Sequence, residues 1–297
     1  MSDALAELIG VACKRVVHPA ISGFAARLAE ESGGETVLFY GSNLRTGSLE
    51  GVIDYYVLTS GAEENGMWPR VSYREWEHDG EVLRAKIATI TLAKFAKACR
   101  GESRDTTIWA RFVQPCAIVH ARSDAARDAT LAALRHAART ATRLAVAVGP
   151  ESGTEADYWR ALFRATYKAE LRVEKPGREN SILEANAAHF QGLLPAAMEA
   201  EGIAFTSQGE VLVPAMTEQE RKRVLGWWKR RRRLGKPLNI ARLLRATRTF
   251  DGAGRYAAWK VERHTGVKVE VTPWREKHPV LAAPAVLWKV WRAKRQP

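Results

Sequence analysis

The chain contains 297 residues and carries a formal net charge of +13, from 46 Lys and Arg against 33 Asp and Glu. This length is sufficient for two or three domains that bury a substantial core, and no run of 18 or more apolar residues predicts a membrane-spanning helix. The first residues include acids and lack the basic and long apolar segments of a secretory signal, so we expect no targeting signal.

The first part of the chain predicts a mixed α/β domain. Residues 1–31 are predicted to be helical, and a Gly-containing turn at residues 31–34 leads into the first strand. Apolar alternation predicts strands near residues 35–40, 52–58, 82–90 and 115–120, with helices between them. We therefore expect an α/β (α+β) domain at residues 1–121, built on a mixed sheet with helices.

The second part is predicted to be helical. Ser123 is a candidate N-cap for a long helix to Val148, and further helices are expected at residues 154–167 and 181–198. We assign residues 122–204 to a helical domain that closes over a substrate. A short hairpin around Gly209 then precedes a basic region, so residues 205–297 form the third predicted unit.

The most informative segment places a Gly-Ser turn between two apolar strands. Gly41 permits a tight turn, and Ser42 with the following N–H groups could hold phosphate oxygens. Asp54 begins the second strand, where alternation places it with Tyr56 on one face and Val57 on the other. A carboxylate in a cleft beside bound phosphates is typical of a Mg²⁺ site for phosphoryl or nucleotidyl transfer. A structural loop followed by an ordinary strand is the alternative interpretation.

This segment resembles the mitochondrial-type phosphatidate cytidylyltransferases, the translocator assembly and maintenance family, which make CDP-diacylglycerol from CTP and phosphatidic acid. The resemblance rests on Tyr-Gly-Ser at residues 40–42, followed by an apolar-Ile-Asp strand at residues 52–54. Polymerase-type enzymes carry a second acid two residues later, where this chain has Tyr56. The family, like this chain, has a single acid.

Four further blocks resemble the family in the same order, at residues 86–90, 108–115, 166–176 and 181–190. The resemblance implies that Tyr40, Gly41 and Ser42 bind the nucleotide, that Asp54 binds Mg²⁺, and that Lys86 and Arg111 stabilise charge. It also implies that three residues of the third block bind the substrate: Tyr167, Lys168 and Arg172. The chain departs from the family where its His-Lys pair is replaced by Val113 and Gln114.

The resemblance implies a nucleotidyltransferase-like mixed sheet at residues 1–121. It also implies a magnesium-dependent CTP:phosphatidate cytidylyltransferase of phospholipid biosynthesis. The lipid phosphate is already anionic, so its attack on the α-phosphorus of CTP depends on alignment and charge neutralisation rather than on a general base. Two alternatives stay open. One is an RNA- or protein-directed nucleotidyltransferase whose basic tail binds nucleic acid, and the other is a non-catalytic membrane-binding protein.

The positive charge is concentrated in the last third of the chain. Residues 201–297 contain 22 Lys and Arg against 8 Asp and Glu, together with six of the ten Trp. Basic and indole side chains together indicate an anionic membrane surface or nucleic acid. We interpret residues 225–233 and 281–295 as interfacial segments. The lipid substrate of the family favours a peripheral protein at the cytoplasmic face of the inner membrane of a bacterial-type cell.

Other polar clusters are less specific. Four acids at residues 75–81 could supply a second metal ligand, but a hairpin around Asp79-Gly80 is the favoured interpretation. The odd number of cysteines, and the lack of metal-ligand spacing among them, favour reduced structural thiols in a cytosolic compartment: Cys13, Cys99 and Cys116.

Overall fold

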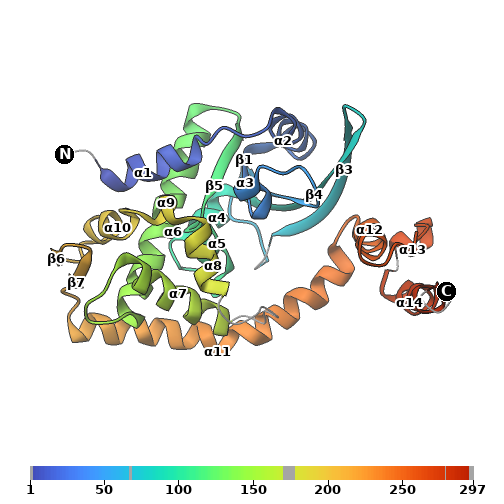
Figure 1. Ribbon diagram of the computed structural model, residues 1–297. Helices are drawn as coiled ribbons and strands as arrows, with labels where there is room; N and C mark the ends of the chain where they lie inside the picture. Colours follow the sequence, from blue (N-terminus) through green and yellow to red (C-terminus); the bar gives the residue numbers. More distant parts are fainter. Residues whose placement is uncertain (1–2, 67–68, 170–177, 278, 294–297) are drawn as a thin grey trace.

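The computed structural model describes residues 3–66, 69–169, 178–277 and 279–293 (Figure 1). Its centre is a five-stranded sheet in the order β3-β4-β2-β1-β5, in which β2 and β4 are parallel and the other neighbours are antiparallel. The mixed sheet predicted from the sequence is therefore confirmed. The strands are β1 (Gly34–Tyr40), β2 (Ile53–Thr59), β3 (Arg70–His78), β4 (Glu81–Thr91) and β5 (Cys116–Ala121).

The strands β3 and β4 form the hairpin expected around Asp79-Gly80. His78 pairs with Glu81, and the two turn residues have φ angles of 51° and 78°. Positive φ at both central positions is the requirement of a two-residue hairpin turn, which Asp-Gly meets at little cost. The acids of this segment lie on an exposed hairpin, as the favoured interpretation predicted.

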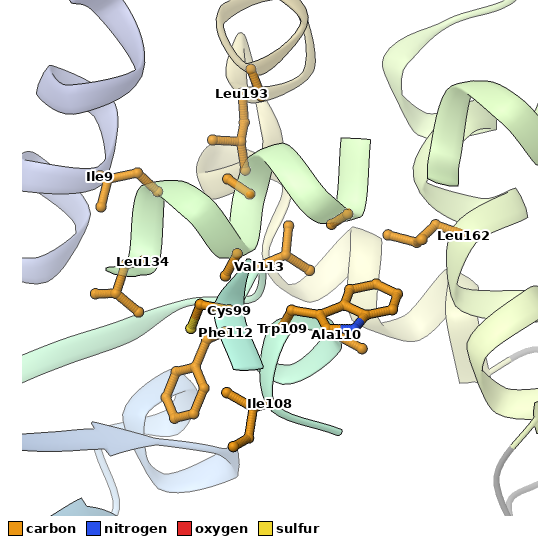
Figure 2. Close-up of a cluster of buried hydrophobic side chains, with 14 of the residues drawn as sticks. Ile9, Cys99, Ile108, Trp109, Ala110, Phe112, Val113, Leu134, Leu162 and Leu193 are labelled. Atoms are coloured by element: carbon orange, nitrogen blue, oxygen red, sulfur yellow. The ribbon is translucent and has the colours of Figure 1, made fainter. Parts of the chain in front are cut away.

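Helices cover both faces of the sheet. On one face, α2 (Pro19–Ser32) packs Phe24 and Leu28 against buried side chains that include Val37 and Tyr55. On the other face, side chains such as Leu38 pack against helices of the larger core, part of which Figure 2 shows around a completely buried indole. Those helices are α1 (Ala4–Cys13), α4 (Leu92–Cys99), α5 (Thr107–Phe112) and α6 (Asp124–Val148).

Two segments that were predicted to be helical contain breaks in the structure. In the described part of residues 1–31, α1 and α2 are separate helices, because Pro19 starts a new helix whose first turn is capped by the His18 ring. The predicted helix at residues 181–198 is wrong as a single element, since Asn186 and Gly192 interrupt it. Its parts are α8 (Arg178–Ala185), α9 (Ala187–Phe190) and α10 (Leu193–Glu201).

Two other helix predictions agree with the structure. The Ser123 side chain accepts a hydrogen bond from the Ala126 N–H at 3.1 Å, so α6 begins where the sequence predicted. The helix α7 (Glu155–Ala169) follows and buries Trp159 and Phe163 in the larger core. All three cysteines are buried and free, in agreement with structural thiols.

The remaining elements extend from the helical region back to the sheet. The hairpin around Gly209 is confirmed, and it leads into one long helix that crosses the molecule (Figure 1). This helix contacts α6 and α7 along its first part and β3 near its end. The elements are β6 (Phe205–Gln208), β7 (Val211–Pro214), α11 (Glu218–Thr249), α12 (Ala253–Thr265), α13 (Pro273–Lys277) and α14 (Pro279–Ala293). Within the described ranges, no helix has the length and apolarity to span a membrane.

Candidate functional site

A row of five side chains crosses the sheet at the level of Asp54, the single acid of β2. The register pairs Cys116 with Tyr40, Tyr40 with Asp54, Asp54 with Lys86, and Lys86 with Tyr73. Directly paired residues in a sheet point to the same face. The sheet therefore brings Asp54 and Lys86, which the sequence analysis assigned to one site, to adjacent positions.

The alternation predicted for β2 is confirmed. Tyr56 and Leu58 belong to the larger core, and Val57 packs on the opposite face against α2. Asp54 lies two residues before Tyr56, so its carboxylate shares the face that α4, α5 and α6 cover. Asp54 itself is half-buried.

The Gly-Ser loop passes directly over this carboxylate. Gly41 has a φ of 92°, and a Cβ at this position would lie 2.9 Å from Oδ2 of Asp54. Both the backbone conformation and the available space therefore require glycine. The short helix α3 (Ser42–Thr46) follows, and Ser42 at its start is exposed to solvent.

Asn43 holds this loop in place, a role that the sequence analysis did not assign. Its side chain is buried, and Nδ2 donates hydrogen bonds to the carbonyl oxygens of Ser48 and Glu50 at 2.9 and 2.8 Å. Asn commonly bonds nearby backbone in this way. The Gly-Ser-Asn sequence therefore contained a signal for an ordered loop, independent of any ligand.

Two cations accompany the carboxylate. Burial raises the pKa of Asp54 above its ordinary value, and the charges of Lys86 and Arg111 act in the opposite direction. Part of the Lys86 side chain reaches solvent, yet burial lowers its pKa, against the favourable effect of Asp54. The positive charges of Lys86 and Arg111 therefore offset part of the cost of burying the ionised Asp54 carboxylate.

Arg111 is positioned by an aromatic ring. Its guanidinium carbon lies 5.0 Å from the centroid of the Tyr40 ring, a cation–π contact. Burial is the main cause that raises the pKa of Tyr40 to about 12, so its hydroxyl stays protonated. Tyr40, predicted to bind nucleotide, is buried and packs against Phe112 and Tyr56, which makes it a support for Arg111.

A pocket of about 210 Å³ adjoins the Gly-Ser loop. Gly41 and Ser42 form one wall, and Tyr167 of α7 contributes to another, as expected for a residue of the helical region that faces the loop. Two arginines in the lining, Arg15 and Arg45, were not identified from the sequence. Arg45 lies three residues after Ser42, whereas Arg15 follows α1 without any recognisable motif.

The other predicted substrate-binding residues are placed differently. Lys168 is exposed at the end of α7 and does not line this pocket, and Arg172 lies outside the described residues. Of the two positions that depart from the family, Gln114 lines the pocket and Val113 is buried. The Val113 carbonyl oxygen lies 2.9 Å from Nε2 of His189, which fastens α9 beside the pocket.

The donor set around Asp54 fits Mg²⁺ only together with a ligand. Among the described residues, no three His, Cys, Asp or Glu side chains are grouped to hold a metal. Mg²⁺ is commonly bound by one or two carboxylates, with substrate phosphates and water completing its octahedron. Asp54 could therefore hold the ion once phosphate oxygens are present.

The prediction that residues 225–233 form an interfacial segment is wrong for the two tryptophans of that segment. Trp228 is only 4% exposed, and the Trp227 ring packs 5.9 Å from the buried Trp109 ring. Arg231 also donates hydrogen bonds to the carbonyl oxygens of Gly101 and Ser103. Part of this basic cluster therefore fixes α11 to the core.

The second segment does present tryptophans to solvent. Trp288 and Trp291 of α14 are 59% and 51% exposed, and Leu281 on the same helix is also exposed. With spacings of seven and three residues, these side chains lie within one face of the helix.

A comparison of this chain with known protein families and with curated proteins found no match.

Proposed function

We propose that the protein is a magnesium-dependent CTP:phosphatidate cytidylyltransferase that acts at a membrane surface. The observation that carries this proposal is the placement of one half-buried carboxylate, Asp54, between the Gly-Ser loop and the cations Lys86 and Arg111. A single acid among cations suits a reaction between two anions, in which repulsion is the main obstacle.

In this proposal, the chain binds CTP with its triphosphate at the Gly-Ser loop and the adjoining pocket. Arg15 and Arg45 would neutralise phosphate charge, and Tyr167 would close the pocket from α7. A Mg²⁺ ion held by Asp54 and phosphate oxygens would supply further charge neutralisation. Lys86 and Arg111 would then stabilise the negative charge on the reacting phosphate groups during the transfer.

The transfer itself exchanges one phosphoanhydride bond for another. An oxygen of the phosphatidate phosphate attacks the α-phosphorus of CTP and forms the new P–O bond. The bond to the β-phosphate breaks and pyrophosphate leaves, so no proton has to be removed from the attacking group. This chemistry therefore requires no general base.

The exposed face of α14 supports a lipid acceptor. Tryptophan favours the membrane interface because its ring is apolar while its N–H requires a polar partner. Exposed cations on α11, among them Lys229, Arg230 and Arg233, would also suit RNA. An RNA-directed nucleotidyltransferase is therefore the second candidate function.

A transfer assay distinguishes these functions. Purified protein is incubated with each labelled nucleotide, Mg²⁺, and either phosphatidate vesicles or RNA. We expect labelled CDP-diacylglycerol from CTP and vesicles alone, with loss of activity on chelation and recovery on addition of Mg²⁺. Label in RNA would replace the lipid function with the second candidate, and no product with any acceptor would contradict both.

Membrane attachment gives a separate prediction. Replacing Trp288 and Trp291 with Ala is expected to reduce co-sedimentation with anionic vesicles severalfold, because two interfacial indoles are lost. Added salt should weaken binding further, since surface attraction decays over a Debye length of about 8 Å at physiological ionic strength.

The control for this experiment is the double variant Val11→Ala and Val16→Ala. It removes two exposed apolar side chains near the other end of the chain and should leave sedimentation unchanged. Equal pelleting of wild type and the Trp variant, or complete release of the wild type by competing RNA, would contradict the membrane assignment.

A further inference from the structure

The helix α12 lies against the edge strand β3 (Figure 1), and β3 contributes Tyr73 to the row that contains Asp54 and Lys86. We propose that this helix supplies Lys260 to the site, where Lys260 and Arg242 of α11 bind the phosphate monoester of the acceptor. This inference rests on the proposed function for the identity of the acceptor. It assigns part of the basic C-terminal region to substrate binding, in addition to membrane attachment.

The start of α12 is fixed to β3 by the backbone. The Tyr73 N–H donates to the Asp251 carbonyl oxygen at 2.7 Å, and the Arg74 guanidinium forms an ion pair with the Asp251 carboxylate, also at 2.7 Å. Gly252 has a φ of 81°, and a Cβ there would lie 2.6 Å from the Tyr73 carbonyl oxygen. The chain therefore approaches the strand as closely as glycine allows, which sets the position of the helix.

Aromatic contacts continue from this anchor toward the site. The Tyr256 ring packs 5.5 Å from the ring of Tyr73, which is completely buried and pairs with Lys86 in the sheet. Lys260 follows one helical turn later, and its Nζ lies 5.9 Å from the centroid of the Tyr256 ring. Side chains from β2, β4, β3 and α12 thus form one continuous series from Asp54 to Lys260.

A second contact orients the same helix. The Trp259 ring contacts two guanidinium groups, with Arg84 of β4 at 5.8 Å and Arg263 of α12 at 5.3 Å from its centroid. Arg263 also reaches the loop before β2, since a Cβ on Gly51 would lie 2.9 Å from its Nη1. The helix is therefore held at both β4 and the loop that leads to Asp54.

The arrangement gathers more positive than negative charge. Arg111, Arg242 and Lys260 all lie close enough to Lys86 for their positive charges to act on it, and so does the Asp54 carboxylate. Asp105 lines a small pocket with Arg242 and accepts a hydrogen bond from the backbone at the start of α5, so it is a second carboxylate near these cations. Among the residues named here, four cations face two carboxylates, and a phosphate with two negative charges would offset the excess positive charge.

The position of this cluster separates it from the pocket that we assign to CTP. That pocket adjoins the Gly-Ser loop after β1, whereas Lys86 is on β4 and Lys260 is on α12, which contacts β3 and β4. Asp54 is on β2, between β1 and β4. The two anionic substrates would therefore approach the carboxylate from opposite sides, as attack on the α-phosphorus requires.

The test uses Lys260→Gln in the full chain, with soluble dihexanoyl phosphatidate as acceptor so that membrane attachment does not contribute. We expect the KM for this acceptor to rise about tenfold, because one charge-assisted hydrogen bond is lost. The KM for CTP should not change, because its pocket lies on the other side of Asp54. Lys260→Arg should restore most of the affinity.

The matched control is Lys229→Gln, which removes an equal charge from an exposed position on α11. An equal rise in KM for both variants would indicate a general charge effect and overturn the inference. An unchanged KM in Lys260→Gln would overturn it as well.

A binding measurement separates this inference from the proposed function. Calorimetric titration with dihexanoyl phosphatidate, without nucleotide, requires no transfer. Wild-type binding that weakens about tenfold in Lys260→Gln supports the site even if no transfer is ever detected. Active wild type with equal phosphatidate affinity in both proteins would remove Lys260 from the site and leave the proposed function intact.

Discussion

Replacing Asp54 with Asn is expected to reduce cytidylyl transfer by about a hundredfold or more, the scale seen when one key electrostatic group is lost. Asn has nearly the same shape but lacks the negative charge that a hard cation requires. Because Lys86 and Arg111 remain, CTP should still bind. The kcat is therefore expected to fall much more than the affinity for CTP, measured by single-turnover transfer and by equilibrium binding.

The same variant is expected to be at least as stable as the wild type at neutral pH. Burial raises the pKa of Asp54 in the folded protein above its ordinary value near 3.8, so the folded state favours the protonated carboxyl. Its ionised form therefore lowers stability at pH values above the folded-state pKa, and Asn removes that cost. The difference in thermal midpoint between Asp54→Asn and the wild type should disappear as the pH falls below the pKa that Asp54 has in the unfolded chain.

The control is Glu77→Gln, the same carboxylate-to-amide change on the exposed hairpin. It should leave both transfer and thermal stability close to wild type. Near-normal transfer by Asp54→Asn would falsify the proposed site, whereas lost transfer together with a large loss of stability would indicate a structural role for the carboxylate.

Local sequence signals account for much of the fold. Ser123 begins α6 because its hydroxyl caps the helix, and Asp79-Gly80 turns the β3–β4 hairpin because both residues accept positive φ. Such signals depend on a few neighbouring residues. They gave no warning of the breaks at Asn186 and Gly192, where an apolar helical pattern continues across the interruptions.

Tryptophan illustrates why composition alone misplaced part of the C-terminal region. Trp227 and Trp228 have the same basic neighbours as the exposed indoles of α14, yet they pack beside Trp109 in the core. An amphipathic ring suits an interior contact as well as a membrane surface. Only the path of α11 across α6 and α7 decides which role each tryptophan takes.

The site was predictable to the extent that it follows one strand and its loop. Asp54 and Gly41 lie in a short segment whose pattern indicated their proximity, and strand pairing then brought Lys86 beside them. Arg15 and Lys260 come from distant helices and carry no motif. Their positions depend on how α1 and α12 dock, which is a property of tertiary packing.

Replacing Gly41 with Ala is expected to reduce transfer by about a hundredfold while the fold is retained. The added methyl group would lie 2.9 Å from Oδ2 of Asp54, closer than real contacts allow, so the carboxylate must move. A displacement on the order of 1 Å at a reacting centre can cost about a hundredfold in rate. The backbone conformation, with φ of 92° and ψ of −160°, adds strain of roughly 1–3 kcal/mol for alanine.

Gly47→Ala separates displacement of the carboxylate from strain in the same loop. Gly47 also has a positive φ, of 70°, but a Cβ there would meet no atom within 4 Å. We therefore expect Gly47→Ala to lower the thermal midpoint by a few degrees, for a cost of about 1–2 kcal/mol, with transfer close to wild type. If both variants transfer equally well, close contact between the Gly-Ser loop and Asp54 is not required for the reaction. A selective loss in Gly41→Ala would place the chemistry at this contact, because the two substitutions add the same methyl group to the same loop.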